Sequence, residues 1–127
     1  MPGQLFEYAV IRVVPRVERE EFINIGVIVY CPKQKFLKAL LQVDEARLNA
    51  FAPGVDIECL KDNINSFERI TNGDKQAGPI AQLDQASRFR WLTATRSTVV
   101  QSSKVHPGLC TDAEATLVKL FNQLVSL

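Results

Sequence analysis

The chain has 127 residues, of which 46% are hydrophobic and 23% charged, a composition typical of a folded globular domain and not of a disordered segment. Its longest apolar run is Val27 to Cys31, far short of a membrane-spanning helix, and its net charge of +1 does not support a large nucleic-acid footprint. Arg12 interrupts the N-terminal stretch before it resembles a secretory signal. We therefore expect one cytoplasmic domain, residues 1–127, that does not enter a membrane.

Three strands are predicted in the first third of the chain. Residues 5–14 are rich in β-branched and aromatic side chains and end at Pro15, and residues 22–31 have the same character and end at Pro32. Residues 36–43 follow after a short connection. Short connections between consecutive strands favour an antiparallel meander.

The alternation of side chains predicts one core face and one aromatic and polar face for this sheet. The core face takes Ala9, Ile11, Val13, Ile23, Ile25, Val27, Val29, Cys31, Leu37, Ala39, Leu41 and Val43. The other face takes Phe6, Tyr8, Val10, Arg12, Asn24, Gly26, Ile28, Tyr30, Phe36, Lys38 and Gln42. If the residue numbers paired in the first hairpin sum to about 36, Arg12 lies opposite Asn24 and Val10 opposite Gly26, where a depression is expected.

Helices are predicted from residue 44 onward. Aspartates that can cap a helix precede three of them, at Asp44, Asp56 and Asp84. The first runs through Ala50 and is stopped by Pro53-Gly54, and the second ends at Asn72-Gly73. The third covers residues 84–92, with an extended conformation of Arg90-Trp91-Leu92 as the alternative for its end. Residues 97–101 are predicted as a fourth strand.

The last helix is predicted from a capping box, Thr111 with Glu114, which is followed by an apolar stripe at helical spacing from Leu117 to Val125. Together these elements indicate an α+β fold: an antiparallel sheet of three to five strands with helices packed on one face, the last helix among them.

The three cysteines and the single histidine argue against metal and cofactor chemistry. Cys31, Cys59 and Cys110 are widely spaced and form no CxxC pair, so neither a zinc site nor a disulfide framework is indicated. We expect all three to be reduced, with Cys31 and Cys59 buried. His106 stands in a Pro-Gly turn, where it is a general base or, as the simpler interpretation, a turn contact.

A basic segment is the first candidate site. Residues 85–111 contain four bases and no acid. Guanidinium groups bind phosphate or carboxylate, neighbouring hydroxyls add shorter hydrogen bonds, and a tryptophan can stack on a base. The candidates are Arg88, Arg90, Trp91, Arg96, Ser97 and Thr98. Alternatively the aromatic residues are core anchors while the arginines cover the acidic half at 44–84, or the segment docks a protein.

The second candidate surrounds Arg12, which interrupts an apolar strand where an unpaired charge is costly. Its expected partner is a carboxylate of the following loop, Glu18, Glu20 or Glu21, with Asn24 opposite. This arrangement is either a structural ion pair or a ligand-binding or catalytic pair of arginine and glutamate.

Two stretches resemble a bacterial family. The segment from Tyr8 to Val29, YAVIRVVPRVEREEFINIGVIV, resembles its opening, and RFRWLTATRSTVVQ from Arg88 with VHPGLC from Val105 resembles its later part. The family is the domain-of-unknown-function family 3037, with Thr95 a departure where proline is expected. The resemblance covers essentially the whole chain. It implies no activity, but it implies frequent genomic neighbourhood to kinase-like proteins similar to HipA.

The sequence thus favours a non-catalytic accessory or interaction protein that binds a protein partner, such as a HipA-like kinase encoded nearby. The contact surface would be the aromatic and polar sheet face or the arginine segment. The alternatives are a small nucleic-acid-binding module that uses the arginine and tryptophan segment, and an enzyme that acts on an anionic substrate through Arg12 and a glutamate. Neither a metal nor a cofactor is predicted.

Overall fold

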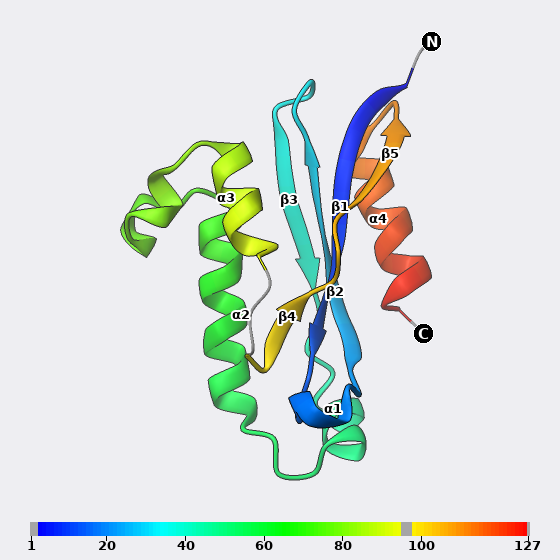
Figure 1. The fold of residues 1–127 in the computed structure, drawn as a ribbon, viewed down its shortest axis with the longest axis vertical. Coiled ribbons are helices and arrows are strands. Elements are labelled where there is room, and N and C mark those ends of the chain that lie inside the picture. The colour runs from blue at the N-terminus through cyan, green and yellow to red at the C-terminus, as the bar shows by residue number, and fades with distance from the viewer. Residues whose placement is uncertain (1–2, 95–97, 127) are drawn as a thin grey trace.

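The computed structural model describes residues 3–94 and 98–126. Five strands and four helices, with three short 3-10 helices, make up these ranges (Figure 1). In chain order they are β1 (Gln4–Val13), η1 (Val17–Arg19), β2 (Ile23–Cys31), β3 (Phe36–Leu41), α1 (Glu45–Phe51), α2 (Ile57–Thr71), η2 (Lys75–Ala77), η3 (Ile80–Gln82), α3 (Gln85–Leu92), β4 (Val100–Ser102), β5 (His106–Cys110) and α4 (Ala113–Leu124).

The strands form one antiparallel sheet with the order β3-β2-β1-β4, and β5 also pairs with β1. The two short strands share one edge of β1: β4 pairs with residues 11–13 and β5 with residues 4–8. The predicted α+β class and antiparallel meander are confirmed.

Two strand predictions needed correction. The fourth strand spans Val100–Ser102, so it begins later than predicted. His106–Cys110 is a fifth strand, where the sequence indicated a turn, because proline and glycine are tolerated on an edge strand. Gly108 has a packing role there: a Cβ atom at this position would lie 2.6 Å from the ring of Phe6, which crosses β5 at this point.

The predicted aspartate caps are confirmed for α1, α2 and α3. Asp44, Asp56 and Asp84 each accept a hydrogen bond from the backbone N–H three residues later, at 3.0, 3.0 and 2.7 Å. For α4 the capping residue is Asp112, which accepts from the Ala115 N–H at 3.2 Å, so the predicted Thr111 capping box is wrong. A carboxylate one residue later takes the capping position, and Glu114 instead binds Lys38 on β3.

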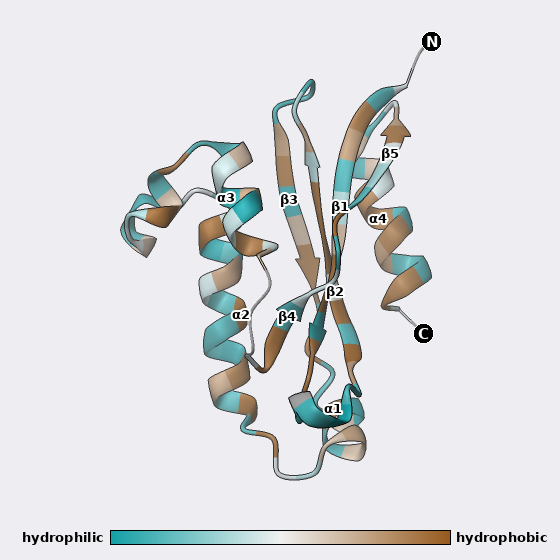
Figure 2. Ribbon diagram, viewed as in Figure 1, coloured by the Kyte–Doolittle hydropathy of each residue, from teal (hydrophilic) through white to brown (hydrophobic). Residues whose placement is uncertain are grey.

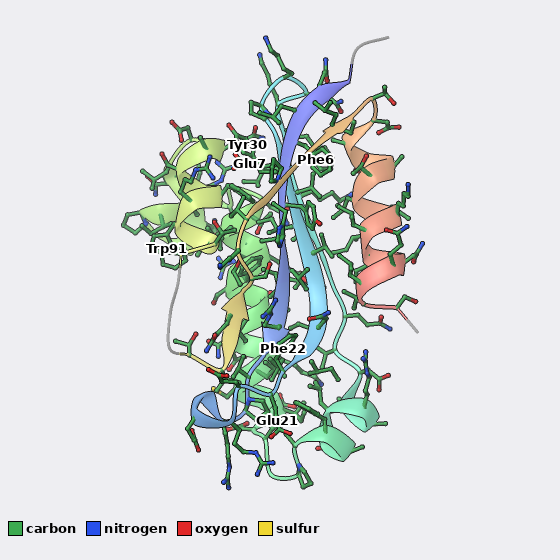
Figure 3. All side chains as sticks on the ribbon, turned by 45° about the vertical axis from the view of Figure 1, so that its right-hand side comes forward. Phe6, Glu7, Glu21, Phe22, Tyr30 and Trp91 are labelled. Atoms are coloured by element: carbon green, nitrogen blue, oxygen red, sulfur yellow. The ribbon has the colours of Figure 1, made fainter. Side chains whose placement is uncertain are left out.

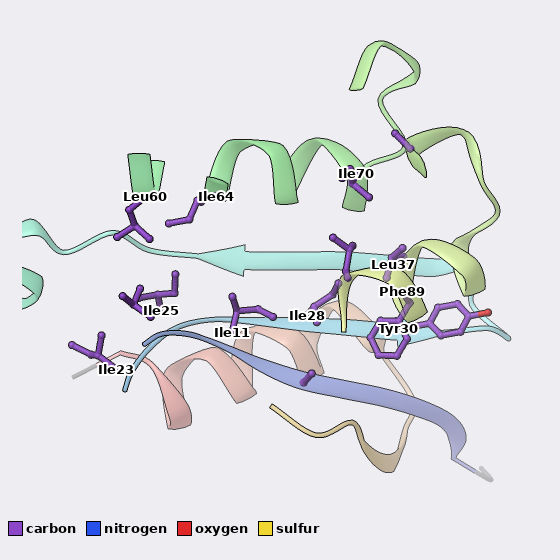
Figure 4. Close-up of a cluster of buried hydrophobic side chains, with 14 of the residues drawn as sticks. Ile11, Ile23, Ile25, Ile28, Tyr30, Leu37, Leu60, Ile64, Ile70 and Phe89 are labelled. Atoms are coloured by element: carbon purple, nitrogen blue, oxygen red, sulfur yellow. The ribbon is translucent and has the colours of Figure 1, made fainter. Parts of the chain in front are cut away.

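Helices cover both faces of the sheet (Figure 1): α2 and α3 pack on one side and α4 on the other. The first core lies between the sheet and α2 with α3, and includes Ile11, Leu60 and Phe89 (Figure 4). The second core, under α4, includes Val27, Val29 and Leu117. The prediction of helices on one face is therefore wrong, because β2 presents apolar side chains to both sides and each side has to be covered.

An irregularity in β2 explains how one strand contributes to two cores. Arg12 lies opposite Asn24, as predicted, but its neighbour Ile11 lies opposite Gly26, so Ile25 is an extra residue in the pairing. Odd-numbered side chains of β2 before the bulge therefore point to one face of the sheet, and odd-numbered side chains after it point to the other. Ile23 and Ile25 join the first core, whereas Val27 and Val29 join the second. The single core face predicted for all of them is wrong for this reason.

The same bulge changes the role of Gly26. This residue pairs with Ile11 and Leu41 rather than with Val10. A Cβ atom at Gly26 would collide with the Leu41 side chain and would lie 2.6 Å from the Leu40 carbonyl oxygen. The glycine therefore permits close approach of β3, and the predicted depression does not form.

Part of the predicted aromatic and polar face is buried. Phe6, Val10 and Tyr30 are 6%, 8% and 8% exposed. Phe6 packs in the core under α4. Tyr30 packs in the other core, where the centres of the Tyr30 and Phe89 rings are 5.4 Å apart. Because helices cover both faces, these three side chains are not available to a partner, and exposed functional groups lie toward the ends of the sheet.

Candidate functional site

The described arginines of the predicted basic segment are engaged within the protein. Arg90, on α3, donates two hydrogen bonds to the Glu7 carboxylate on β1, at 3.0 and 2.7 Å. This pairing raises the pKa of Arg90. Arg88 donates to the Leu83 carbonyl oxygen at 2.7 Å, and its guanidinium lies against Gly73 at the end of α2. Both side chains therefore join elements of the fold.

Trp91 and Thr98 are the other members of that segment that the structure describes. Trp91 is 39% exposed on α3. The Thr98 hydroxyl donates to the Val100 carbonyl oxygen at 2.6 Å, a contact that stabilises the entry to β4. Arg96 and Ser97 lie outside the described residues. The structure thus does not bring the described candidates of this segment together around one ligand.

Arg12 occupies a different environment. It lies near the end of β1 in a polar row across the sheet, with Gln101 of β4 on one side and Asn24 of β2 on the other. Its guanidinium carbon lies 3.9 Å from the centre of the Phe22 ring, a cation–π geometry. Its Nε atom is buried and has no hydrogen-bond partner, and burial lowers the pKa of the guanidinium.

The predicted carboxylate partner of Arg12 is not found. None of the described carboxylates forms an ion pair with Arg12. Glu21 pairs with Arg19 two residues away, and Glu18 is exposed in η1. The η1 turn brings Arg19 and Glu21 close in sequence and in space, so this local pair forms instead of a pair with Arg12.

A cavity of about 390 Å³ opens beside the Arg12 guanidinium. It is lined by Arg12, Val14, Glu20, Phe22 and Gln101. We call it the Arg12 cavity. Glu20 has a φ of 56°, the left-handed region that costs a residue with a side chain about 1–2 kcal/mol. Phe22 is 44% exposed, so an aromatic ring and a poorly compensated positive charge meet at an open surface.

A second cavity of about 450 Å³ lies on the same β1–β2 connection, residues 14–22, where it meets the α1–α2 connection, residues 52–56. Its lining includes Arg16, Arg19, Glu21 and Phe51. We call it the Phe51 cavity. Phe51 is 36% exposed at the end of α1. We refer to the two cavities and the two connections together as the hairpin end.

The figures locate the hairpin end relative to the other candidates. In Figure 3, Phe22 and Glu21 lie at the end of the sheet beside α1, whereas Glu7 and Tyr30 lie toward its opposite end. The β1–β2 connection is drawn largely in the hydrophilic colour of Figure 2. The exposed aromatic rings of Phe22 and Phe51 therefore stand in a polar surround, as in the anchors of protein interfaces.

Asn24 and His106 do not join the Arg12 cavity. The Asn24 amide donates to the Leu124 carbonyl oxygen of α4 at 3.1 Å, and its Oδ1 atom is buried without a partner. It lines a separate cavity of about 230 Å³ together with Asp44 and Arg47. His106 lies on β5, where the centre of its ring is 5.2 Å from the centre of the Tyr8 ring. Arg12, a glutamate and His106 therefore do not converge, as the enzyme hypothesis would require.

The cysteines correct one further prediction. Cys31 and Cys110 are buried and Cys59 is exposed, so the expected burial of Cys59 is wrong. Cys59 lies in the first turn of α2 on the face away from the core. Burial raises the pKa of the Cys110 thiol, and the neighbouring Cys31 adds to this effect. In the ranges that the structure describes, no three His, Cys, Asp or Glu side chains could hold a metal ion together.

Three side chains of the hairpin end that the site uses were not among the sequence-predicted candidates: Phe22, Phe51 and Gln101. Glu20, one of the three carboxylates expected near Arg12, does line the Arg12 cavity. The sequence pattern makes Phe22 the first residue of a strand, and Phe51 lies at the end of a helix. A useful signal was nevertheless present, because Phe22 directly follows a charged loop and so marks an apolar side chain at a polar edge. Gln101 could be found only from the pairing of β4 with β1.

These features define a two-core α+β protein with an arginine and aromatic surface at one end of its sheet. Among the described helices, none has the length and apolar character needed to cross a lipid bilayer. The chain belongs to the family described as protein of unknown function (DUF3037), which it matches over residues 8–125. Comparison with curated proteins and with solved structures found no match.

Proposed function

We propose that this protein is a non-catalytic interaction module whose hairpin end binds a protein partner. The observation that supports this most strongly is Arg12, which is partly buried, makes a cation–π contact with the exposed Phe22 ring, and has no ion pair among the described residues. A partly buried charge without a partner destabilises the folded protein in its unbound state. A binding partner that pairs with the charge would offset this destabilisation.

The composition of the hairpin end suits a polypeptide partner. Arginine and aromatic residues are enriched in protein interfaces and supply most of their strongest contacts. Phe22 and Phe51 each line one of two cavities on the same connection. A partner segment that crosses this connection would contact both rings and Arg12 at once.

The proposed setting is the bacterial cytosol, and the proposed partner is a HipA-like kinase encoded nearby. This partner rests on the genomic association that the family resemblance implies, and no residue of the site selects a kinase. The hairpin end supports the narrower statement that the partner presents a polar segment with apolar side chains.

The nucleic-acid alternative loses support from the geometry of α3. Arg88 and Arg90 are hydrogen bonded to Leu83 and Glu7, so contact with phosphate would compete with existing bonds. The enzyme alternative retains a cavity with Arg12 and Glu20, but none of the described residues that line it is a serine, cysteine, threonine or lysine nucleophile.

The test is chemical crosslinking followed by affinity capture of the tagged protein from its native cells, with and without nuclease treatment. Wild-type protein is compared with Phe22→Ala and with a control, Leu109→Ala. Leu109 is 72% exposed on β5, away from the hairpin end. We expect one protein to be captured in stoichiometric amount by the wild type and by the control, and to be lost with Phe22→Ala.

Two results would refute the proposal. Capture that is equally strong with Phe22→Ala would place the interface elsewhere. Retention of nucleic acid that disappears with nuclease and with added salt would favour the nucleic-acid alternative, because such binding is driven by release of counterions.

A further inference from the structure

We infer that the Arg12 cavity binds a carboxylate side chain, glutamate or aspartate, presented by the partner polypeptide. This inference rests on the proposed function for the source of the carboxylate. The binding chemistry itself follows from the residues of the cavity.

The position of Arg12 explains why an anion is missing from its surroundings. Arg12 lies in the polar row between Gln101 and Asn24, but neither neighbour accepts a hydrogen bond from it within the described part of the chain. The Gln101 amide donates to the Thr98 carbonyl oxygen at 2.8 Å, and the Asn24 amide donates to Leu124. The terminal N–H groups of the guanidinium are therefore left for a group from outside, whereas Nε is buried.

The contact with Phe22 places the Arg12 guanidinium over an aromatic ring, with the guanidinium carbon 3.9 Å from the ring centre. A guanidinium carries its N–H groups in one plane. A carboxylate is also planar and accepts two parallel hydrogen bonds from such a fork. Arg12 therefore has the chemistry for two-point recognition of a carboxylate.

The charges that line the cavity favour a carboxylate over a phosphate. Among the described lining residues there is one cation, Arg12, and one anion, Glu20. A singly charged carboxylate can be balanced by Arg12 alone. A phosphate dianion would bring a second negative charge close to Glu20 with no second cation in the lining, and like charges repel.

The apolar lining indicates that the carboxylate is carried on a short aliphatic stem. Phe22 and Val14 form the apolar part of the wall, and the remaining lining is polar or charged. A glutamate or aspartate side chain would place its methylene groups against Phe22 while its carboxylate contacts Arg12. A bare anion would leave this apolar wall uncovered.

The test is an NMR titration of the full-length, ¹⁵N-labelled protein, which follows the Nε–Hε signal of Arg12. Three probes are used separately: the capped peptide Ac-Gly-Leu-Glu-Leu-Gly-NH₂, the same peptide with Gln in place of Glu, and inorganic phosphate. We expect the Glu peptide to shift the Arg12 signal saturably at concentrations on the order of millimolar. We expect the Gln peptide and phosphate to bind at least about tenfold more weakly.

Two arginine variants provide the matched comparison. Arg12→Lys keeps the charge but loses the planar fork, and should weaken Glu-peptide binding about fivefold or more. Arg90→Lys, on α3 beside Glu7 and outside the hairpin end, should leave it unchanged. Equal binding of the Gln peptide, equal binding of phosphate, or equal loss with Arg90→Lys would overturn the inference. Wild-type protein with the two peptides decides the question even if Arg12→Lys does not fold.

The result is separable from that of the capture experiment. A positive titration together with a capture that does not depend on Phe22 would refute partner binding at the hairpin end and leave a site for carboxylates from another source. A negative titration together with Phe22-dependent capture would refute the carboxylate and leave the docking surface.

Discussion

Replacing Arg12 with methionine is expected to stabilise the protein, although it removes a residue that we place in the binding site. Burial lowers the pKa of the Arg12 guanidinium, which means that the folded state disfavours its charge. Methionine keeps an unbranched stem that can follow the same path along the sheet, and it has no charge to desolvate.

The expected size of the change follows from two opposing contributions. A buried donor without a partner, as at Arg12 Nε, costs about 1–3 kcal/mol. The contact between the guanidinium and Phe22 contributes about 0.5–1 kcal/mol in the opposite direction. The variant should therefore be more stable by about 1 kcal/mol, which in a domain of this size raises Tm by roughly 3–5 °C.

The measurement is urea denaturation, followed by circular dichroism and by fluorescence of Trp91, the only tryptophan. Arg90→Met is the matched control, since Arg90 is paired with Glu7, whose side chain is only 23% exposed. Breaking this partly exposed pair should destabilise the protein by up to about 1 kcal/mol. The same substitution is thus expected to have opposite signs at the two positions.

A destabilisation of Arg12→Met that equals or exceeds that of Arg90→Met would refute the reasoning. Arg12 would then stabilise the folded state, and its lack of an ion pair would not indicate a binding site. The m-values have to remain unchanged for the comparison to report folded-state stability, because a changed m-value signals a change in the denatured state.

Three further predictions concern other parts of the fold. Gly26→Ala should lower the free energy of unfolding in urea by at least about 2 kcal/mol, because the new Cβ overlaps β3; a near-neutral result would contradict the close approach. A backbone hydrogen bond holds the pKa of Asp84 below its usual value, so the ionised carboxylate stabilises the fold above that value and this contribution is lost as the pH falls through the lowered pKa. Asparagine can also cap a helix but does not titrate, so Asp84→Asn should reduce the decrease in the free energy of unfolding below about pH 4. Urea denaturation at a series of pH values measures this decrease. An unchanged decrease in the variant would contradict a stabilising role for the ionised cap. A thiol reagent should modify Cys59 rapidly in the native protein and Cys31 and Cys110 only after unfolding, whereas equal rates for all three would contradict their burial.

Local sequence patterns predicted most of the elements, because the signals that begin and end them are local. The aspartate caps at residues 44, 56 and 84 each make the backbone contact that their position suggests. The antiparallel order of the first three strands follows from connections too short for a crossover. The two-sided core could not be predicted in this way, since the bulge at Ile25 interrupts the alternation on which the assignment of faces depends.

The site was predicted in part, for a similar reason. A charge within an apolar strand marked Arg12, and the pairing with Asn24 was correct. The identity of its contacts depended on which side chains meet across the hairpin end, and the prediction of a carboxylate partner failed because Glu21 binds Arg19 locally. Arg88 and Arg90 were marked by composition alone, which does not distinguish an exposed arginine from one bonded to Leu83 or Glu7.

The extra residue in β2 also determines where the chain can change its length. Deleting Ile25 would restore a regular ladder, with Ile23 still opposite Val13 and Asn24 still opposite Arg12, but it would remove the Ile25 side chain from the first core. A deletion or insertion between residues 14 and 22 would alter only a surface connection. Length variation among homologues is therefore expected in that connection, and evolution can reshape the surface at this end of the sheet while leaving the packing of both cores intact.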